Sequence, residues 1–405
     1  MSKQVIKRRS RGFICVNAHP EGCRRNVAQQ IAVAQKAPRD AVTANAPRNV
    51  LIIGASTGYG LASRIAAAWG YSARTLGVFF ERPPDGDKTA SAGYYNTAAL
   101  AERAASDGLY AAHVNGDAFS DECKRRAIEI IRRNLAPVDL ILYSLASPKR
   151  VHPRTGIAYA SVLKPIGRAF NSRTVELDAE KVMDVTLASA AENEIADTVA
   201  VMGGEDWGMW IEALAGENLL AQGARTLAYS YIGPELTWPI YRDGTIGRAK
   251  QDLEQTARAL NQMLAGKLGG SACIAVNKAV VTQASAAIPV VPLYLSLLSR
   301  VMGAKSLDEH PIEQMCRLFS DFLATGRPHA ADAAGRIRLD DREMRADVQS
   351  EVSALFPQVT TENLRQLTDF AGFQREFRNL FGFEIAGVDY EQAFETDVPL
   401  ADSPA

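Results

Sequence analysis

Short apolar runs alternate with longer amphipathic stretches through the first two thirds of the chain. The runs have the length and branching of strands buried on both faces, and the intervening stretches have helical periodicity. Strands are predicted over Val50–Ile53, Thr75–Phe80, Tyr110–Asn115, Val138–Ser144, Thr226–Ile232 and Ser271–Val276. Helices are predicted over Leu61–Trp69, Tyr94–Asp107, Asp121–Asn134, Asp178–Met202, Glu212–Ala221 and Gly247–Leu264. Repeated alternation of this kind predicts an α/β fold with a doubly wound parallel sheet and helices on both faces.

Three stretches depart from this rhythm. Residues 149–175 alternate around Thr155-Gly156 and predict a β-hairpin excursion at the rim of the sheet, and residues 203–210 predict a loop. The apolar stretch 285–298 contains Pro289 and Pro292, and it is too short and too broken to span a bilayer. A lid helix over an apolar chain and a buried core helix explain this stretch equally well. Further helical stretches follow after residue 330 and end the chain.

A glycine-rich loop follows the first predicted strand of the sheet. Gly54, Gly58 and Gly60 give the spacing G-x-x-x-G-x-G, and a helix starts directly afterwards. A strand, a glycine loop and a helix together direct backbone N–H groups and a helix N-terminus at a pyrophosphate. This arrangement makes the predicted sheet Rossmann-like. The expected cofactor contacts in the loop are Gly54, Ala55, Ser56, Thr57, Gly58 and Tyr59.

The end of the second predicted strand carries Phe80 and Glu81, both expected to contact the cofactor. An acid at this position accepts hydrogen bonds from the adenosine ribose hydroxyls and repels the 2′-phosphate of NADP. We therefore expect NADH as the cofactor. Two observations weaken this inference: a glutamate can simply end a strand, and Arg82, which follows directly, can soften the repulsion.

Other expected cofactor contacts also follow predicted strands. Asp117 can bond an adenine amine, although an aspartate there also suits a helix N-cap. Small residues after the next strand let the backbone pass close to the nicotinamide ribose, and the segment after the last strand can bond the nicotinamide carboxamide. These expected contacts are Asp117, Ala118, Leu145, Ala146, Val280, Val281 and Thr282.

A tyrosine and a lysine stand near the carboxyl end of the strand predicted at 226–232. Tyr241 and Lys250 are nine residues apart, so they would lie on opposite faces of one continuous helix. They converge only if Tyr241 precedes the regular helix, and Gly244 and Gly247 make such a bend plausible. An ammonium beside a phenol is expected to lower its pKa, and the pair can then stabilise or protonate an oxyanion. For these two residues alone, a core tyrosine and a solvated lysine are the more common explanation.

Composition narrows the class of protein. The chain has 405 residues, 47% hydrophobic and 22% charged, and a formal net charge of −1. These values are ordinary for a globular protein and give no reason to expect nucleic-acid or membrane partners. The basic N-terminus lacks a following apolar region, so we expect no signal peptide. The five cysteines lack metal-ligand spacing, even where His19 lies between Cys15 and Cys23, so we expect no metal and reduced thiols in a cytoplasm.

Taken together, these motifs resemble those of the FabV-type trans-2-enoyl reductases. The resemblance rests on the loop from Gly54 to Gly60, on Glu81, on Tyr231 and on the Y-x8-K spacing of Tyr241 and Lys250. It covers nearly the whole chain, from Arg11–Cys15 to Gly382–Tyr390. Ordinary short-chain dehydrogenases have Y-x3-K, and other short-chain enoyl reductases have Y-x6-K.

The resemblance implies NADH-dependent reduction of the trans-2 double bond of enoyl-CoA or enoyl-acyl carrier protein, the last reductive step of fatty acid elongation. Tyr241 and Lys250 would be the catalytic residues, with Lys250 also holding the nicotinamide ribose. Tyr231 would bind substrate and assist at the carbonyl. A cytoplasmic monomer is implied, and no flavin fingerprint is present.

Two other functional classes stay open, and so does the detail of the substrate. A short-chain ketoreductase acting on a 3-oxoacyl thioester would use the same cofactor, and a non-catalytic dinucleotide-binding protein would bind NADH without turnover. The sequence leaves open the acyl length, the natural carrier and the response to inhibitors. We expect a single domain over 1–405, with a dinucleotide-binding core over about 48–284, a substrate lid over about 285–303 and C-terminal helical additions over about 304–405.

Overall fold

The computed structural model describes residues 3–37, 46–324 and 331–400. The ranges 1–2, 38–45, 325–330 and 401–405, which the expected single domain includes, lie outside the described residues.

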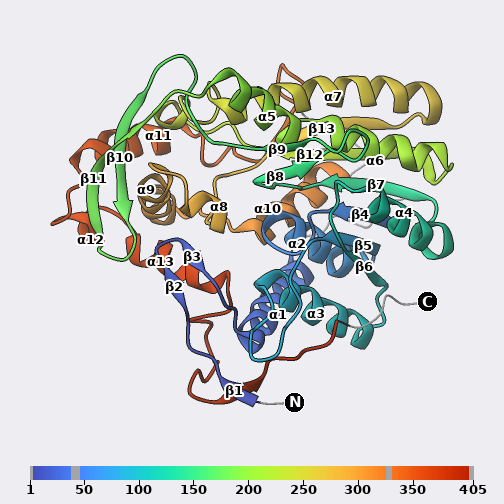
Figure 1. Ribbon diagram of the computed structural model, residues 1–405, viewed down its shortest axis with the longest axis horizontal. Helices are drawn as coiled ribbons and strands as arrows, with labels where there is room; N and C mark the ends of the chain where they lie inside the picture. Colours follow the sequence, from blue (N-terminus) through green and yellow to red (C-terminus); the bar gives the residue numbers. More distant parts are fainter. Residues whose placement is uncertain (1–2, 38–45, 325–330, 401–405) are drawn as a thin grey trace.

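A seven-stranded sheet lies at the centre of the molecule (Figure 1). Its order is β14-β13-β12-β7-β4-β5-β6, and all neighbouring strands are parallel, which confirms the predicted sheet. The chain first adds strands on one side of β4 and then returns to the other side with β7, so the order reverses between β4 and β7. Ligands of open α/β sheets bind at the carboxyl ends of the strands near such a reversal. The strands are β4 (Asn49–Ile53), β5 (Arg74–Phe79), β6 (Ala111–Asn115), β7 (Val138–Tyr143), β12 (Leu220–Ser230), β13 (Ser271–Val276) and β14 (Ile337–Arg338).

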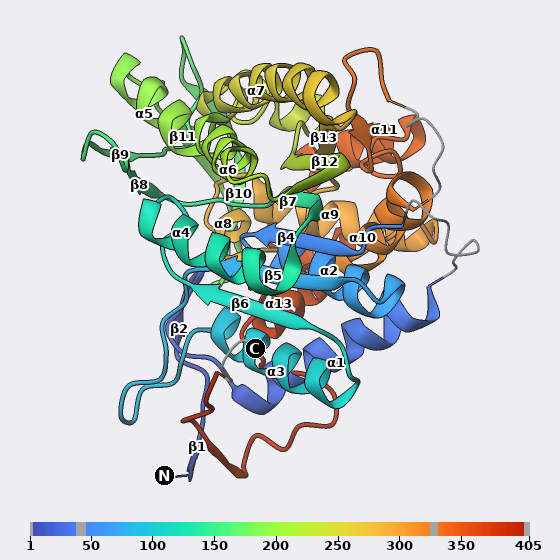
Figure 2. The ribbon, with the colours of Figure 1, turned by 90° about the vertical axis from the view of Figure 1, so that its right-hand side faces the viewer.

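Helices cover both faces of the sheet (Figure 2). Alternate side chains of β4 point to opposite faces. Val50 and Ile52 join an apolar core with the helices of one face, while Leu51 and Ile53 join a core with the helices of the other. The first face carries α1 (Pro20–Lys36), α2 (Gly58–Ile65), α3 (Ala92–Ser106) and α10 (Pro311–Leu318). The second face carries α4 (Asp121–Ile130), α6 (Glu205–Gly216) and α7 (Thr245–Leu268). Short π-helical segments extend α2, α4 and α10 over Ala66–Gly70, Ile131–Leu135 and Phe319–Leu323.

The hairpin excursion is longer than predicted. β8 (Lys149–Val151) pairs with β9 (Ala158–Ala160), as expected, and β10 (Phe170–Glu176) pairs with β11 (Lys181–Leu187) in a second hairpin. The helix predicted from Asp178 is therefore wrong over β11, and only α5 (Glu192–Met202) is helical in that range. In Figure 1 the second hairpin stands at the left edge of the molecule, far from the central sheet.

The loop predicted over 203–210 is also wrong, because α6 begins at Glu205. Its buried residues Trp207, Trp210, Ile211 and Leu214 follow helical spacing, so the tryptophans belong to an amphipathic helix. The helix predicted to reach Ala221 ends at Gly216, because β12 already begins at Leu220.

A third apolar core lies beside the sheet and is built largely from the C-terminal part of the chain. Its centre is α9 (Val291–Ala304), whose residues Leu293, Tyr294 and Leu297 are buried, as the core-helix interpretation requires. Strand β15 (Ala393–Glu395) pairs with β1 (Lys3–Val5), so the chain returns to its beginning. The remaining elements are β2 (Ser10–Arg11), β3 (Ile14–Cys15), α8 (Gln283–Ala286), α11 (Ala346–Leu355), α12 (Leu364–Leu367), α13 (Phe370–Asn379) and 3₁₀ turns at Glu235–Thr237 and Phe356–Gln358.

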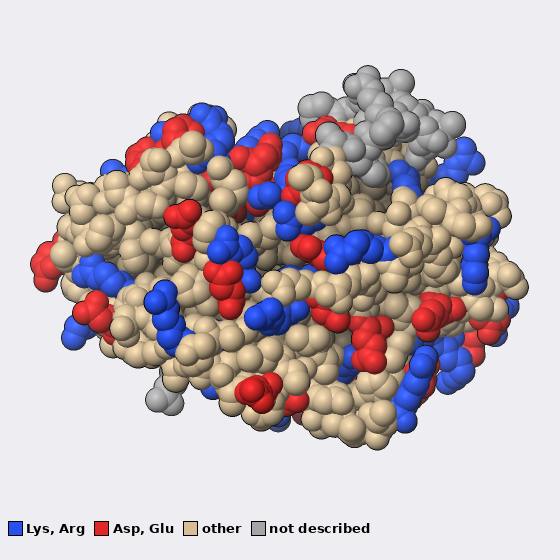
Figure 3. Space-filling model, turned by 90° about the horizontal axis from the view of Figure 1, so that it is seen from above, with Lys and Arg blue, Asp and Glu red and all other residues tan. Residues whose placement is uncertain are grey.

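Charged and apolar residues are distributed over the surface and along the helices of the described chain. Acidic and basic side chains are interspersed over the face seen in Figure 3. Among the helices that the structure describes, none is both long enough and apolar enough to cross a membrane.

Candidate active site

The predicted site residues gather along one edge of the sheet. The segments that carry them follow the carboxyl ends of β4, β5, β6, β7, β12 and β13. These strands are parallel, so their carboxyl ends lie at the same edge. The fold therefore brings together segments that are more than two hundred residues apart in the chain, from Gly54 to Thr282.

The glycine loop after β4 is closely packed. A β-carbon at Gly60 would lie 1.9 Å from the carbonyl oxygen of Gly54, and one at Gly54 would lie 2.4 Å from that of Ser144. Gly54 also has φ +86°, a conformation that favours glycine. The Tyr59 hydroxyl donates to the carbonyl oxygen of Lys278 (2.6 Å), which ties the start of α2 to the segment after β13. These two glycines thus allow the loop to pack tightly, while a β-carbon at Gly58 would have nothing within 4 Å, so the start of α2 is open to a ligand.

Glu81 is held firmly after β5. Its Oε1 accepts from the Ser56 hydroxyl (2.7 Å), and its main chain exchanges two hydrogen bonds with the side chain of Asn115. A β-carbon at Gly93 would lie 2.0 Å from the same Oε1, so Gly93 leaves the room that the carboxylate occupies. The neighbouring Phe80 is 77% exposed and can offer its ring to a ligand. These contacts fit the predicted adenosine side of a dinucleotide site.

The next residues predicted to contact the cofactor follow β6 and β7. Asp117 Oδ1 accepts from the Phe119 N–H (3.0 Å), and the N-cap of α4 is Ser120. Asp117 is therefore a turn residue and not the N-cap. Ala118 is buried, Leu145 is half-buried and Ala146 is exposed.

The segment after β13 forms a short helical cap. Thr282 is the N-cap of α8, and its hydroxyl oxygen accepts from the Ser285 N–H (2.9 Å). The same hydroxyl can still donate its proton to a phosphate oxygen. Val280 and Val281 precede it, half-buried and buried respectively.

A cavity of about 530 Å³ joins the two sides of this edge. Its lining includes Thr57, Gly58 and Glu81 from the first half of the sheet and Val280–Thr282 from the second. The α9 residues Leu295 and Ser299 also line it. The volume of the cavity and the residues that line it fit a bound dinucleotide. Tyr231, Tyr241 and Lys250 are not part of this lining and lie further along the edge.

The chain bends before α7, between Tyr241 and Lys250, as the sequence analysis predicts. Tyr241 lies before α7, and its N–H donates to the Thr237 carbonyl oxygen (3.0 Å) in the preceding turn. Its ring packs edge-on against Tyr231, with centroids 4.7 Å apart. Lys250 is on α7, and its Nζ donates to the carbonyl oxygen of Tyr229 (3.1 Å). The bend before the helix is therefore present, and the two tyrosines are in contact.

The acid–base properties of these groups differ from expectation. Burial, followed by the charge of Glu343, raises the pKa of Tyr241 instead of lowering it. The same causes raise the pKa of Tyr231. Burial lowers the pKa of Lys250 to about 8. Both tyrosines are therefore neutral phenols at physiological pH, and they act as hydrogen-bond donors and not as phenolates.

Two residues that the sequence analysis missed complete the tyrosine cluster. Glu343 Oε1 accepts from the hydroxyls of Tyr231 (3.0 Å) and Tyr294 (2.6 Å). Glu343 stands in the charged run Asp340-Asp341-Arg342-Glu343, which gives no sequence signal of burial, and Tyr294 stands in an apolar helix.

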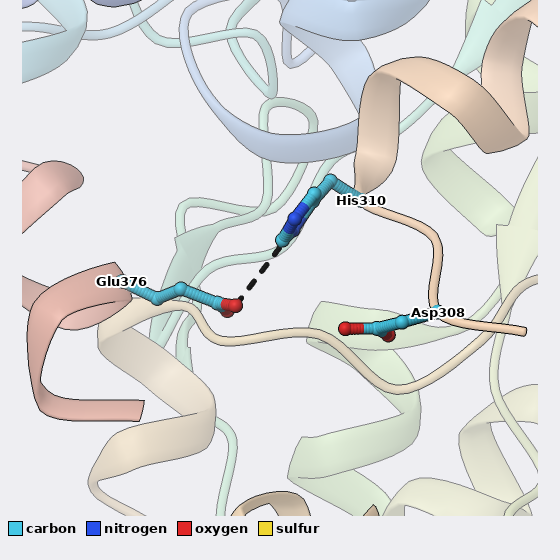
Figure 4. A group of neighbouring side chains, drawn as sticks. All are labelled: Asp308, His310 and Glu376. Carbon is cyan, nitrogen blue, oxygen red and sulfur yellow. Dashed lines mark ion pairs between the residues drawn. The ribbon is translucent and has the colours of Figure 1, made fainter. Parts of the chain in front are cut away.

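An acidic cluster with one histidine lies at another part of the cavity (Figure 4). The side chains of Asp308, His310 and Glu376 place ligand-type atoms within 4.8 Å of one another. The Lys278 ammonium is 3.1 Å from Asp308 Oδ1, and His310 Nδ1 is 3.8 Å from Glu376 Oε1. The Lys278 ammonium already faces Asp308, so we assign no metal here, and the absence of a metal stays a prediction.

The Cys15–His19–Cys23 segment is explained by packing. Both cysteines are buried, and His19 is the N-cap of α1, where its Nδ1 accepts from the Gly22 N–H (3.1 Å). Its ring packs edge-on against Tyr390 and Phe394. Burial lowers the pKa of His19 to about 4, so this histidine is neutral.

The fold and the glycine loop after β4 define a protein of the dinucleotide-binding α/β class. The chain matches the trans-2-enoyl-CoA reductase catalytic region over residues 88–324 and the NAD(P)H binding domain of trans-2-enoyl-CoA reductase over residues 5–86. It also matches the enoyl reductase FAD binding domain over residues 331–394. The chain belongs to the trans-2-enoyl-CoA reductase family.

Relatives resemble the chain over nearly its full length. An enoyl-[acyl-carrier-protein] reductase [NADH] from Flavobacterium johnsoniae is 55% identical over 387 residues, covering 96% of each chain. One from Coxiella burnetii is 53% identical over 394 residues, covering 97% of this chain and 96% of that one.

Solved structures agree with this assignment. The Clostridium acetobutulicum trans-2-enoyl-CoA reductase in complex with NADH has a TM-score of 0.93 at 40% identity, over 99% of this chain and 100% of that one. The Treponema denticola trans-2-enoyl-CoA reductase in complex with NAD has a TM-score of 0.91 at 46% identity, over 96% and 98%.

Proposed function

We propose that the protein reduces the trans-2 double bond of enoyl thioesters with NADH. The observation that carries this proposal is the contact between Tyr231 and Tyr241 at the carboxyl edge of the sheet. Lys250 donates to Tyr229 on β12, two residues before Tyr231. The relatives named as NADH-dependent enoyl-[acyl-carrier-protein] reductases and the reductase structures with NADH and NAD support it.

The residues of the chain fit a bound nicotinamide dinucleotide. The glycine loop leaves room for a pyrophosphate at the start of α2, and Glu81 keeps one carboxylate oxygen, Oε2, free of the Ser56 hydroxyl for the adenosine ribose. The backbone from Val280 to Thr282 would hold the carboxamide side, and Lys250 the nicotinamide ribose. When bound, NADH supplies the hydride for the β-carbon of the substrate.

Tyr241 would then act on the charge that develops at the thioester oxygen. That oxygen is neutral in the substrate and becomes negative as the enolate forms, so a donor aimed at it favours the transition state over the substrate. A neutral phenol is suited to this task, because it still carries its proton. Deleting such a donor lowers kcat by about 10²–10³ in other oxyanion sites. Tyr231 would line the thioester site and hold Tyr241 by ring packing.

The test is NADH oxidation, followed by absorbance, after addition of a crotonyl thioester to the purified chain. We expect turnover with the crotonyl thioester and none with an acetoacetyl thioester. Turnover with the acetoacetyl thioester alone would favour a ketoreductase, and NADH binding without any turnover would favour a non-catalytic dinucleotide-binding protein. Parallel assays with coenzyme A and acyl carrier protein thioesters would identify the preferred carrier.

A further inference from the structure

Glu343 is a buried carboxylate to which the reduction proposed above gives no role. Its side chain has no exposed surface, although it follows two other acidic residues and an arginine in the chain. A buried carboxylate is costly unless hydrogen-bond donors satisfy it. The donors of Glu343 therefore indicate what it holds in place.

Three donors surround this carboxylate. Oε1 accepts from Tyr231 (3.0 Å) and Tyr294 (2.6 Å), and Oε2 accepts from the Ala279 N–H (2.7 Å). Gln349 Nε2 donates to the Tyr294 hydroxyl oxygen (3.3 Å), so the proton of Tyr294 is directed at Glu343. Both oxygens of the side chain therefore accept hydrogen bonds, and burial raises the pKa of Glu343.

The three donors come from different parts of the site. Tyr231 directly follows β12, is the residue that we assign to the substrate, and packs against Tyr241. Ala279 begins the segment after β13 that we assign to the nicotinamide side. Tyr294 is on α9, in the core that the C-terminal part of the chain builds. One carboxylate thus connects Tyr231 and the segment after β13 to the buried helix α9.

We propose that Glu343 is a positioning residue for the reduction, which fixes the Tyr231 hydroxyl and the Ala279 backbone relative to each other. This proposal rests on the proposed function. Fixing the Tyr231 hydroxyl fixes the ring that contacts Tyr241, and hence the direction in which Tyr241 donates. Fixing the Ala279 N–H sets the start of the segment that receives the nicotinamide. Catalytic groups need such support, because small displacements in a site cost large factors in rate.

A double-mutant cycle of Glu343→Gln and Tyr231→Phe separates positioning from general support of the core. Glutamine keeps the size of the side chain, but its amide group cannot accept from all three donors. We expect kcat/KM for a crotonyl thioester to fall by about 10-fold to 100-fold in Glu343→Gln. The double variant should lose little more than the less active of the two single variants, because Glu343 acts through Tyr231.

Two further variants serve as controls. Glu351→Gln removes a half-exposed carboxylate that pairs with Lys305 in the same part of the chain, and should keep wild-type kinetics. Tyr294→Phe removes the other hydroxyl that donates to Oε1 and leaves the Tyr231–Glu343 bond in place, so we expect a smaller loss of kcat/KM than in Glu343→Gln. If Glu343→Gln does not fold, Glu343→Asp enters the same cycle in its place.

The NADH dissociation constant, measured by fluorescence, tests the Ala279 contact without turnover. It should rise several-fold in Glu343→Gln and stay near wild type in Tyr231→Phe. Losses of kcat/KM that multiply in the double variant would overturn the proposal, and so would wild-type kinetics with an unchanged NADH dissociation constant in Glu343→Gln. Absence of turnover in the wild-type chain would instead overturn the proposed function, and the NADH measurement would still decide the role of Glu343 toward Ala279.

Discussion

The ammonium of Lys250 on α7 donates to the carbonyl oxygen of Tyr229 on β12 across 3.1 Å. Tyr229 lies two residues before Tyr231, so the helix places its ammonium against the strand that ends directly before this tyrosine. Burial lowers the pKa of Lys250 to about 8, because a buried site disfavours the charged form. The lysine is therefore charged at neutral pH and loses its proton as the pH rises through about 8.

The first prediction is a loss of activity as the pH rises through about 8, the pKa of Lys250. Below that pH the ammonium supports the developing oxyanion, and above it this support is lost. The measurement is kcat/KM for a crotonyl thioester against pH, in the wild type and in Lys250→Ala. The variant should be much less active and should lack this decline. A wild-type profile that stays flat through pH 8 would remove the charge of Lys250 from the mechanism.

The same lysine should also make stability depend on pH. Its folded-state pKa of about 8 is below the usual lysine value of 10.5. Between these two values the unfolded chain binds more protons, so the contribution of Lys250 to the free energy of unfolding rises with pH. Denaturant unfolding of wild type and Lys250→Met should show the wild type gaining relative stability over this interval. A difference that is constant with pH would contradict the lowered pKa.

The second prediction concerns cofactor choice. Glu81→Ala should loosen the preference for NADH, because the carboxylate that repels a 2′-phosphate is removed. Ser56 would lose its acceptor, while the main-chain bonds to Asn115 would persist, so the loop should stay folded. The measurement is the ratio of kcat/KM for NADH and NADPH. An unchanged ratio would show that Glu81 only ends the strand.

The third prediction tests the close packing of the glycine loop. In Gly60→Ala the new β-carbon would meet the Gly54 carbonyl oxygen at 1.9 Å, so the loop must move. We expect weaker NADH binding and a loss of ~1–3 kcal/mol in the free energy of unfolding.

Gly266→Ala is the matched control for this substitution. Gly266 lies inside α7 and is exposed, and a β-carbon added there would have nothing within 4 Å. Alanine in an exposed helix interior should raise the free energy of unfolding by roughly 0.5–1 kcal/mol. The NADH dissociation constant of this control should match wild type. Equal effects of the two substitutions would argue against the close approach at Gly60.

Local sequence is sufficient for much of the fold and part of the candidate site. The strand before Gly54 and the helix after it are fixed by short-range patterns, and so is the bend that places Tyr241 before α7. The predictions are wrong where a pattern fits two structures. β11 alternates over too few residues to exclude a helix, and the predicted loop around Trp207 and Trp210 is a helix because the spacing of these tryptophans is helical.

Glu343 could not be predicted because its partners are distant in the chain. It reaches Tyr231 across 112 residues, and it stands in a charged run typical of surface. The sequence predicts a lowered pKa for Tyr241, and this is wrong for a similar reason. Tertiary packing buries Tyr241 and brings Glu343 near it, and both effects raise the pKa. Interactions between residues so distant in the chain can be identified only from the structure.

The fourth prediction is that the chain is a monomer. The edge of the sheet beyond β13 is occupied by β14, and α9, α11 and α13 build a separate core beside it. These additions would cover surfaces by which smaller short-chain relatives assemble. Sedimentation velocity at low micromolar concentration should give the mass of a single 43.8 kDa chain. A stable dimer or tetramer would contradict the prediction.

The last prediction separates the roles of the two tyrosines and the lysine. Tyr241→Phe should keep NADH binding and lose most turnover, by about 10²–10³ in kcat, because only the hydroxyl that donates to the oxyanion is removed. Phenylalanine keeps the ring that packs against Tyr231 at 4.7 Å, so the fold should survive. Lys250→Ala should weaken both turnover and NADH binding, since we propose that the lysine also holds the ribose. Tyr231→Phe should fall between wild type and Tyr241→Phe.

The measurements for all three variants are kcat, KM for the crotonyl thioester and the NADH dissociation constant. The Tyr231 hydroxyl already donates to Glu343 Oε1 at 3.0 Å, so it has an acceptor within the protein. We therefore expect Tyr231→Phe to lose only part of the activity. If Tyr231→Phe is inactive while Tyr241→Phe stays active, the roles of the two tyrosines are reversed. If Tyr241→Phe weakens NADH binding as much as Lys250→Ala does, the hydroxyl of Tyr241 belongs to the cofactor site and the oxyanion donor must be sought elsewhere.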